Sequence, residues 1–202
     1  MRVGLRDAVK AAARGVAHVL VAPLVASFAI RARLIDPDRA LMASTQLLAL
    51  VPGLPGQYLR RAFLQHAIAY CDATAVIEWG TTLSRTGARL ERNVYVGPCC
   101  HLGLAHLEQD VLIGAGVHIP SGGANHGIED LTIPIREQQG EERVVRVGPG
   151  AWIGSAVVVM ANVGAATVVG AGSVVTRPLP AGVVAAGAPA RVLRSRLAEP
   201  RV

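Results

Sequence analysis

The sequence is short of aromatic residues, and this shortage limits how its core can be built. Only 3% of its 202 residues are aromatic, although 51% are hydrophobic. A core without aromatic side chains must be assembled from Val, Ile, Leu and Ala in close, repeated contact. Together with 22 glycines, this composition favours a stacked solenoid over a sandwich or a helical bundle. The length suffices for one domain with a core of its own.

Cysteine is also scarce, which excludes a fold stapled by disulfides. Cys71, Cys99 and Cys100 are too few and too unevenly spaced for a disulfide framework, and no pair has the CxxC spacing of a zinc site. We therefore expect a reducing compartment, the cytoplasm, and no bound metal.

Lysine is nearly absent, so arginine carries the positive charge. The formal net charge is +6 and Lys10 is the only lysine. Modules that bind nucleic acid usually add aromatic stacking platforms or a basic helix. The sequence shows neither, so we expect no nucleic-acid partner. A basic balance also suits a phosphorylated ligand or an anionic lipid.

One stretch near the N-terminus lacks charge altogether. Residues 15–30 form an uncharged, mostly apolar segment, with Lys10 and Arg14 before it and Arg31 and Arg33 after it. The segment is shorter than the roughly 20 residues of a spanning helix, and Pro23 would kink it. Two interpretations stay open. The segment is either a helix packed on its own protein or a sister subunit, or an anchor on the inner surface of the cytoplasmic membrane.

The first 73 residues are predicted to be helical. Residues 38–50 carry apolar side chains at helical spacing and end at VPGLPG, which is turn chemistry. Residues 57–71 give a second amphipathic pattern, with Arg60, Arg61 and Gln65 expected on its exposed face.

From residue 74 to 177 the dominant spacing is six residues. A six-residue period predicts a parallel β-helix of triangular coils, in which one aliphatic side chain per unit points inward and small residues occupy the corners. A C-terminal extension, 178–202, should follow the coil. The repeated aliphatic residues are Ile77, Leu83, Leu90, Val96, Leu102, Leu107, Ile113 and Ile119, then Val147, Ile153, Val159, Val163, Val169 and Val175.

The repeat is interrupted once, over residues 121–146. This gap is too long for a corner and should project from the coil as a loop, where function tends to concentrate. It opens with SGGANHGIED, which contains His126. Imidazole titrates near neutral pH and can act as a general base.

The segment RVGPGAWIGSAVVV…VVGAGSVVTRPLPAGVVAAGAPARVLR resembles the hexapeptide-repeat acyltransferases. The segments LLALVPGLPGQYLRRAF, VYVGPCCHLG and VHIPSGGANHG are similar to the branch that O-acetylates colanic acid and capsular polysaccharide. The resemblance implies a mainly β fold, a left-handed parallel β-helix with an N-terminal helical segment and a projecting loop. It also implies a homotrimer that transfers acetyl from acetyl-CoA to a sugar hydroxyl in polysaccharide biosynthesis.

The resemblance also assigns roles to residues. It implies His126 as the general base and the backbone N–H of Ser155 as the oxyanion donor. His101 and Asn125 would contact the acceptor, and Glu129 or Asp130 is an open candidate for orienting His126. Contacts with the coenzyme are implied for Trp152, Ser155, Ala171, Thr176, Arg177, Arg191 and Arg194.

Three alternatives remain. An acetyltransferase acting on antibiotics shares the loop histidine and WIGS. A non-catalytic hexapeptide scaffold would keep the repeat but lose that histidine and AAGAPAR. A zinc enzyme of the γ-carbonic-anhydrase type would use His66, His101 and His106, although the sequence around His66 predicts a helix rather than a coil.

Overall fold

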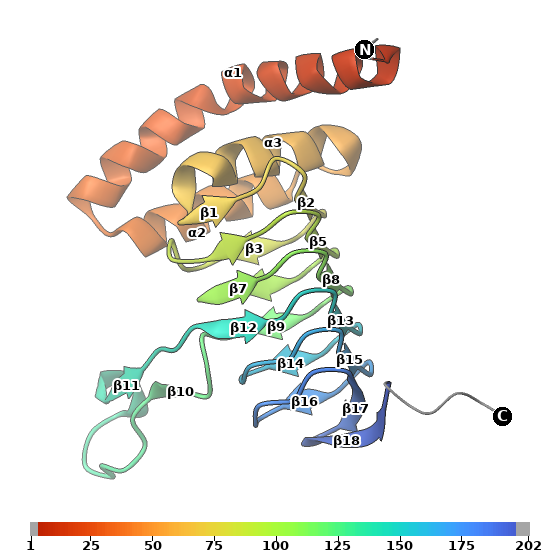
Figure 1. Cartoon of the computed structure of the whole chain (residues 1–202). Helices are drawn as coiled ribbons and strands as arrows, with labels where there is room; N and C mark the ends of the chain where they lie inside the picture. The colour runs from red at the N-terminus through yellow and green to blue at the C-terminus, as the bar shows by residue number, and fades with distance from the viewer. Residues whose placement is uncertain (1–3, 197–202) are drawn as a thin grey trace, which may run out of the picture.

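The computed structural model describes residues 4–196, and it places a layer of helices at one end of a long β coil (Figure 1). The helices are α1 (Leu5–Leu34), α2 (Pro37–Ala49) and α3 (Gly53–Ala67). Asp36 caps α2, accepting a hydrogen bond from the Arg39 N–H at 2.7 Å, and Pro37 follows at the first helical position. Pro23 lies inside α1, which continues through it.

The coil is built from three parallel sheets, here named A, B and C. Sheet A contains β1 (Tyr70–Cys71), β4 (Arg89–Leu90), β7 (Ala105–Leu107) and β12 (Val145–Val147). Sheet B contains β2 (Val76–Ile77), β5 (Tyr95–Val96), β8 (Leu112–Ile113), β13 (Trp152–Ile153), β15 (Val168–Val169), β17 (Val183–Gly187) and β18 (Ala190–Ser195). Sheet C contains β3 (Thr82–Leu83), β6 (His101–Leu102), β9 (His118–Ile119), β14 (Val158–Val159) and β16 (Val174–Val175).

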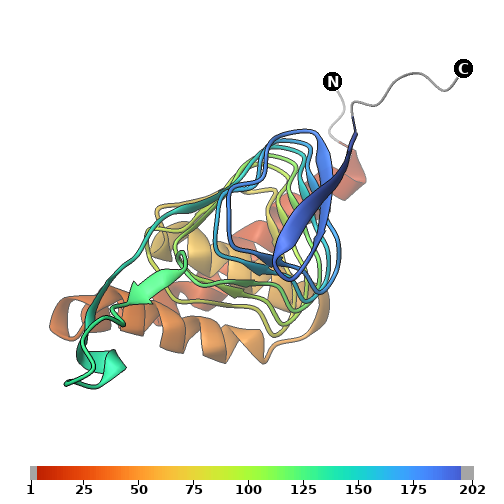
Figure 2. The same ribbon diagram turned by 90° about the horizontal axis from the view of Figure 1, so that it is seen from below.

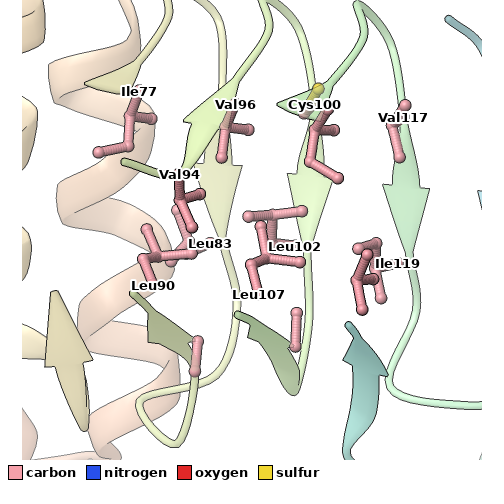
Figure 3. Packing of buried hydrophobic residues seen from close by; sticks show 14 of the residues in the cluster. Ile77, Leu83, Leu90, Val94, Val96, Cys100, Leu102, Leu107, Val117 and Ile119 are labelled. Atoms are coloured by element: carbon pink, nitrogen blue, oxygen red, sulfur yellow. The ribbon is translucent and has the colours of Figure 1, made fainter. Parts of the chain in front are cut away.

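The predicted aliphatic repeat forms the core, as Figure 3 shows for the first coils. Every residue of the repeat is buried, none more than 2% exposed. In sheet B, Val96 stacks between Ile77 and Ile113, and each coil adds the next residue of the ladder. Stacked ladders bury aliphatic side chains without aromatic filling, which explains the composition. The predicted β-helix is therefore confirmed as a β-solenoid of parallel strands.

Where two repeated residues are fewer than six positions apart, the corner between them is shorter. Between Val159 and Val163 the chain has room for only a tight corner, and sheet A continues there as isolated bridges, from Val147 to Val163 and from Val163 to Leu179. Val163 and Leu179 still point into the core, although no regular strand forms around them.

The helical layer covers the first coil and is fastened to it by polar contacts. Thr45 Oγ1 donates to the Leu83 carbonyl at 3.1 Å. Arg60 is 2% exposed and donates to the carbonyls of Ile77, Leu48 and Val51. The expectation that Arg60 and Arg61 lie on an exposed helix face is therefore wrong: both are buried, because the end of the coil supplies carbonyls that only a long donor can reach.

The part of the expected C-terminal extension that the structure describes, residues 178–196, runs along the coil and adds to it, and residues 197–202 lie outside the described residues. Strand β17 pairs in parallel with β15, and Ala185 is fully buried in the same ladder as Val169. Strand β18 then turns back antiparallel on β17 and forms the edge of sheet B. The last described residue is Arg196.

Candidate active site

The predicted loop is a hairpin that projects from the corner between sheets C and A (Figures 1 and 2). Its strands are β10 (Ala124–His126) and β11 (Gln139–Glu141), which pair antiparallel, with the 3₁₀ turn η1 (Ile135–Glu137) between them. Ser121 fastens its base: Ser121 Oγ accepts from the Leu104 N–H at 2.7 Å, and the Ser121 carbonyl accepts from Arg143 at 2.8 Å. The hairpin is thus held where it leaves the coil.

His126 lies at the far end of β10 and is exposed. Its backbone is opposite Gln139. Within residues 4–196, no hydrogen bond to its imidazole ring is formed. Both ring nitrogens are therefore available to a substrate or to a second chain.

The neighbours of His126 have local roles. Asn125, predicted to contact the acceptor, donates from Nδ2 to the Pro120 carbonyl and so ties β10 to the start of the loop. Asp130 Oδ1 accepts from the Thr132 N–H and hydroxyl at 2.8 and 2.6 Å, and these bonds hold the Asp130 pKa below its usual value. Asp130 therefore closes a turn and does not orient His126.

A groove of about 580 Å³ lies beneath the base of the hairpin. One wall is the loop, with Gly122, Gly123 and Ala124 on one branch and Arg143 on the other. The opposite wall is the coil corner after sheet C. This wall is formed by Met160, Ala161, Asn162, Thr176 and Pro178. The groove therefore places Thr176, a predicted coenzyme contact, opposite the base of the hairpin that carries His126.

The predicted oxyanion donor lies at a different corner, between sheets B and C. The Ser155 carbonyl accepts from the Gly172 N–H at 2.9 Å, which stacks this corner on that of Ala171 in the next coil. Trp152 is on the outer face of sheet B and 49% exposed, so it is available as the wall of a pocket.

Arg191 and Arg194 lie on β18, at the edge of the same sheet B. Both are exposed, and their side chains donate to the backbone carbonyls of Ala190 and Ser195. Among the ion pairs of residues 4–196, none involves Arg177, Arg191 or Arg194. Their guanidinium groups are thus free to bind phosphate, which the fork of donors on arginine suits.

One chain therefore holds the predicted residues in two separate groups. Trp152 and the two arginines of β18 lie on sheet B, and Ser155 and Ala171 lie at the corner between sheets B and C. His126 and Thr176 lie at the corner between C and A. Figures 1 and 2 show the hairpin and β18 on different sides of the coil.

His101 lies on the outer face of sheet C. Its Nδ1 is 2.9 Å from Thr82 Oγ1, and its ring centroid is 6.2 Å from that of His118. Burial and the neighbouring His118 lower the pKa of His101. His118 was missed by the sequence analysis; like His101 it directly precedes a buried residue of the repeat, and the two residues pair between neighbouring coils.

The three histidines of the zinc hypothesis lie on three different elements. His66 is in α3 and contacts His18, with 3.3 Å between Nε2 and Nδ1. His106 is in sheet A, where its Nε2 is 2.7 Å from Glu91 Oε1. Over residues 4–196, no three potential metal ligands come together.

Comparisons with known proteins give short matches in sequence and long matches in structure. No family profile matches the chain. It is 38% identical over 74 residues to a probable acetyltransferase of Mycobacterium tuberculosis, which covers 36% of this chain and 25% of that protein. It is 50% identical over 52 residues to the galactoside O-acetyltransferase of Escherichia coli. This match covers 25% of this chain and 26% of that protein. The chain thus spans about a quarter of the length of these curated relatives.

Among solved structures, a galactoside acetyltransferase in complex with coenzyme A has a TM-score of 0.61 to this chain, with 23% identity. The match covers 84% of this chain and 90% of that one. At this identity the likeness shows the fold. The sequence matches to acetyltransferases are confined to short segments of those proteins.

Proposed function

We propose that the chain is an O-acetyltransferase that moves an acetyl group from acetyl-CoA to a hydroxyl of a sugar, in the biosynthesis of a polysaccharide. The observation that carries the proposal is the hairpin, because it presents the exposed imidazole of His126 and because its base lines a groove together with Thr176 and the coil corner after sheet C.

The chemistry assigned to His126 is a proton shuttle. Its neutral imidazole takes the proton of the sugar hydroxyl while the oxygen attacks the acetyl carbonyl carbon. The tetrahedral intermediate collapses by breaking the carbon–sulfur bond. The imidazolium then returns the proton to the departing thiolate, so the products are an acetyl ester and free coenzyme A.

The oxyanion of the intermediate needs a donor held in advance. The Ser155 backbone N–H is the proposed group. Its coil is fixed by hydrogen bonds on both sides: Gly172 donates to the Ser155 carbonyl, and Ala156 donates to the Ala115 carbonyl at 2.8 Å. Loss of one such donor typically reduces kcat by about 10²- to 10³-fold.

The separation of His126 from Ser155 supports a site shared between chains. Catalysis needs the base and the oxyanion donor within about 3 Å of the reacting atoms. Because the hairpin leaves the coil, it can reach sheet B of a neighbouring copy. We therefore propose a homotrimer in which each hairpin completes the site of the next chain.

Support for a sugar acceptor comes from the relatives and from sheet C. The matched protein of Escherichia coli is a galactoside O-acetyltransferase. His101 and His118 stack with Thr82 on one outer face, which gives a polar surface for sugar hydroxyls. A place in the colanic acid and capsular branch rests on LLALVPGLPGQYLRRAF and its companion segments.

The test is an acetyl-transfer assay with labelled acetyl-CoA against nucleotide sugars and oligosaccharides. His126→Ala should lower kcat by about 10²- to 10⁴-fold. The matched control is Leu131→Ala in the same hairpin, where a 95% exposed side chain is removed; it should keep wild-type turnover.

Mixing variants tests the shared site. His126→Ala and a variant damaged at the Ser155 corner should each be inactive, and mixed assemblies should recover part of the activity. Near-wild-type turnover of His126→Ala would refute the assignment of the base. Failure of mixing to restore activity, with the assembly intact, would refute the site between chains.

A further inference from the structure

We propose that the outer face of α1 binds an anionic phospholipid surface, with the helix lying flat on it. The first observation is the composition of α1. From Ala8 to Leu34 the helix is long and apolar enough to cross a membrane. It carries four basic residues and no acidic residue over this range.

The second observation is that the fold leaves most of this helix uncovered. The inner side packs on α2 and α3 through Ala17, Val21 and Phe28, and the other side remains open (Figure 1). Val19 is 73% exposed and Ile30 59%. Only 17% of the apolar window is buried. Soluble monomers rarely leave a continuous apolar surface of this kind uncovered.

The apolar surface also extends beyond α1. A groove of about 370 Å³ runs between α1 and the start of α3. Its lining is apolar: Ala13, Val16, Ala17 and Leu20 on α1, and Leu54, Pro55, Tyr58 and Leu59 on α3. Two segments that are distant in sequence therefore contribute to one surface, which indicates a binding surface rather than isolated exposed residues.

Charge favours lipid over a second copy of the chain. Lys10 and Arg33 are exposed near the two ends of α1, whereas Arg31 donates a hydrogen bond to Ser44 of α2 at 2.8 Å and the Nε of Arg14 is buried. Pairing two α1 helices would bring basic groups together with no acid on either helix, and the chain as a whole carries +6. An anionic surface attracts the exposed Lys10 and Arg33, and each basic residue near it raises binding roughly fivefold.

The packing of α1 on α3 favours a helix that lies on the membrane surface over one that crosses the membrane. The ring of Phe28 meets that of Phe63 at 5.7 Å, and His66 on α3 contacts His18 on α1. To cross a bilayer, α1 would have to break these contacts and expose its buried side to lipid. A helix of 30 residues that keeps them can insert only its outer face, as interfacial helices do.

The test is co-sedimentation of the full chain with vesicles of phosphatidylcholine, with or without phosphatidylglycerol. We expect binding to the anionic vesicles that weakens with salt, and roughly tenfold less binding to the neutral ones. The double variant Val19→Glu with Ile30→Glu should lose roughly tenfold or more of its binding to anionic vesicles. Leu131→Glu, a matched change at an exposed apolar residue of the hairpin, should bind as the wild type does.

A second variant covers the case in which the double glutamate does not fold. Val19→Ser with Ile30→Ser adds no charge and should still lower binding severalfold. Circular dichroism and thermal melting check that both variants are folded. Acetyl transfer to a soluble acceptor should be unchanged in both, so the result is independent of the proposed function.

Three outcomes would overturn the proposal. The wild type could remain in the supernatant with both kinds of vesicle. The glutamate variant could bind vesicles normally but form a smaller assembly in sedimentation equilibrium, which would assign the surface to a second copy. Binding that resists both salt and an alkaline wash would show that α1 crosses the bilayer.

Discussion

Glu142, on the chain returning from the hairpin, accepts hydrogen bonds from the guanidinium of Arg85, with 2.6 Å between its Oε2 and Arg85 Nε. The same guanidinium lies 3.7 Å from Asp38 in α2. Asp38 in turn accepts from the Thr86 N–H at 2.8 Å. Arg85 therefore links the helical layer, the coil and the projecting hairpin.

The first prediction concerns the link between Arg85 and Glu142 at acidic pH. The hydrogen bond from Arg85 lowers the pKa of Glu142 below its ordinary value of 4.5. A lowered folded-state pKa means that the link is complete above about pH 4.5 and is lost as the pH falls through the lowered pKa. The protection of residues 121–144 against hydrogen exchange, taken relative to the intrinsic exchange rate at each pH, should therefore fall in that acidic range.

Arg85→Gln should bring the same loosening at neutral pH, with a loss of stability below about 1 kcal/mol because the pair is partly exposed. Arg92→Gln, which removes a surface pair with Asp110 at 3.6 Å, is the control. Equal exchange of the hairpin in both variants would contradict the role of Arg85.

The second prediction uses a close contact beneath the oxyanion donor. A Cβ on Gly114 would come within 2.7 Å of the Ser155 backbone nitrogen. Gly114→Ala should therefore displace this N–H and lower kcat by up to about 10²- to 10³-fold. Gly15→Ala in α1, where no atom lies within 4 Å of the new Cβ, should keep full turnover. A Gly114→Ala variant that folds and turns over normally would remove Ser155 from the mechanism.

The third prediction concerns coenzyme phosphates. Arg191→Ala should raise the KM for acetyl-CoA by about 10- to 100-fold, because hydrogen bonds to charged groups contribute about 1.5–3 kcal/mol. With acetyl-pantetheine, which has no phosphate, the wild type and the variant should give equal kcat/KM. Arg39→Ala, at an exposed residue of α2, serves as the control. An unchanged KM for acetyl-CoA would place the phosphates elsewhere.

The fourth prediction concerns thiol reactivity. Burial raises the pKa of Cys71 to about 12 and raises that of Cys100, whereas Cys99 is exposed. Since the thiolate is the reactive form, an aromatic disulfide reagent at pH 8 should modify Cys99 quickly and the other two only after unfolding. Cys99→Ser should abolish the fast phase. Fast reaction of two or three thiols in the native protein would contradict the burial of the ladder.

The sequence predicted the coil because the repeat is a local property. An aliphatic side chain every six residues must point inward in any triangular coil, so all the repeated residues could be identified as core. The interruption at 121–146 was equally visible, since no corner can hold so many residues. The hairpin and His126 followed from that interruption and from the family motif.

Other features depend on which parts of the chain the fold brings together. Arg60 and Arg61 form part of an amphipathic pattern, but the open end of the coil supplies carbonyl partners that bury them. The stacking of His101 on His118 depends on the lengths of the intervening corners, which vary between coils.

The sequence by itself determined the inward ladders, the projecting loop and the residue types of the site. Only the tertiary structure showed that, within one chain, the hairpin of His126 and the corner of Ser155 lie at different corners of the β-helix. The reason is that the place of a corner depends on the length of every repeat unit before it, and these lengths vary. Likewise, the apolar run of residues 15–30 left two interpretations open. The packing of α1 on α2 and α3 determined which side is covered, because a helix can bury against one layer only the side that faces it.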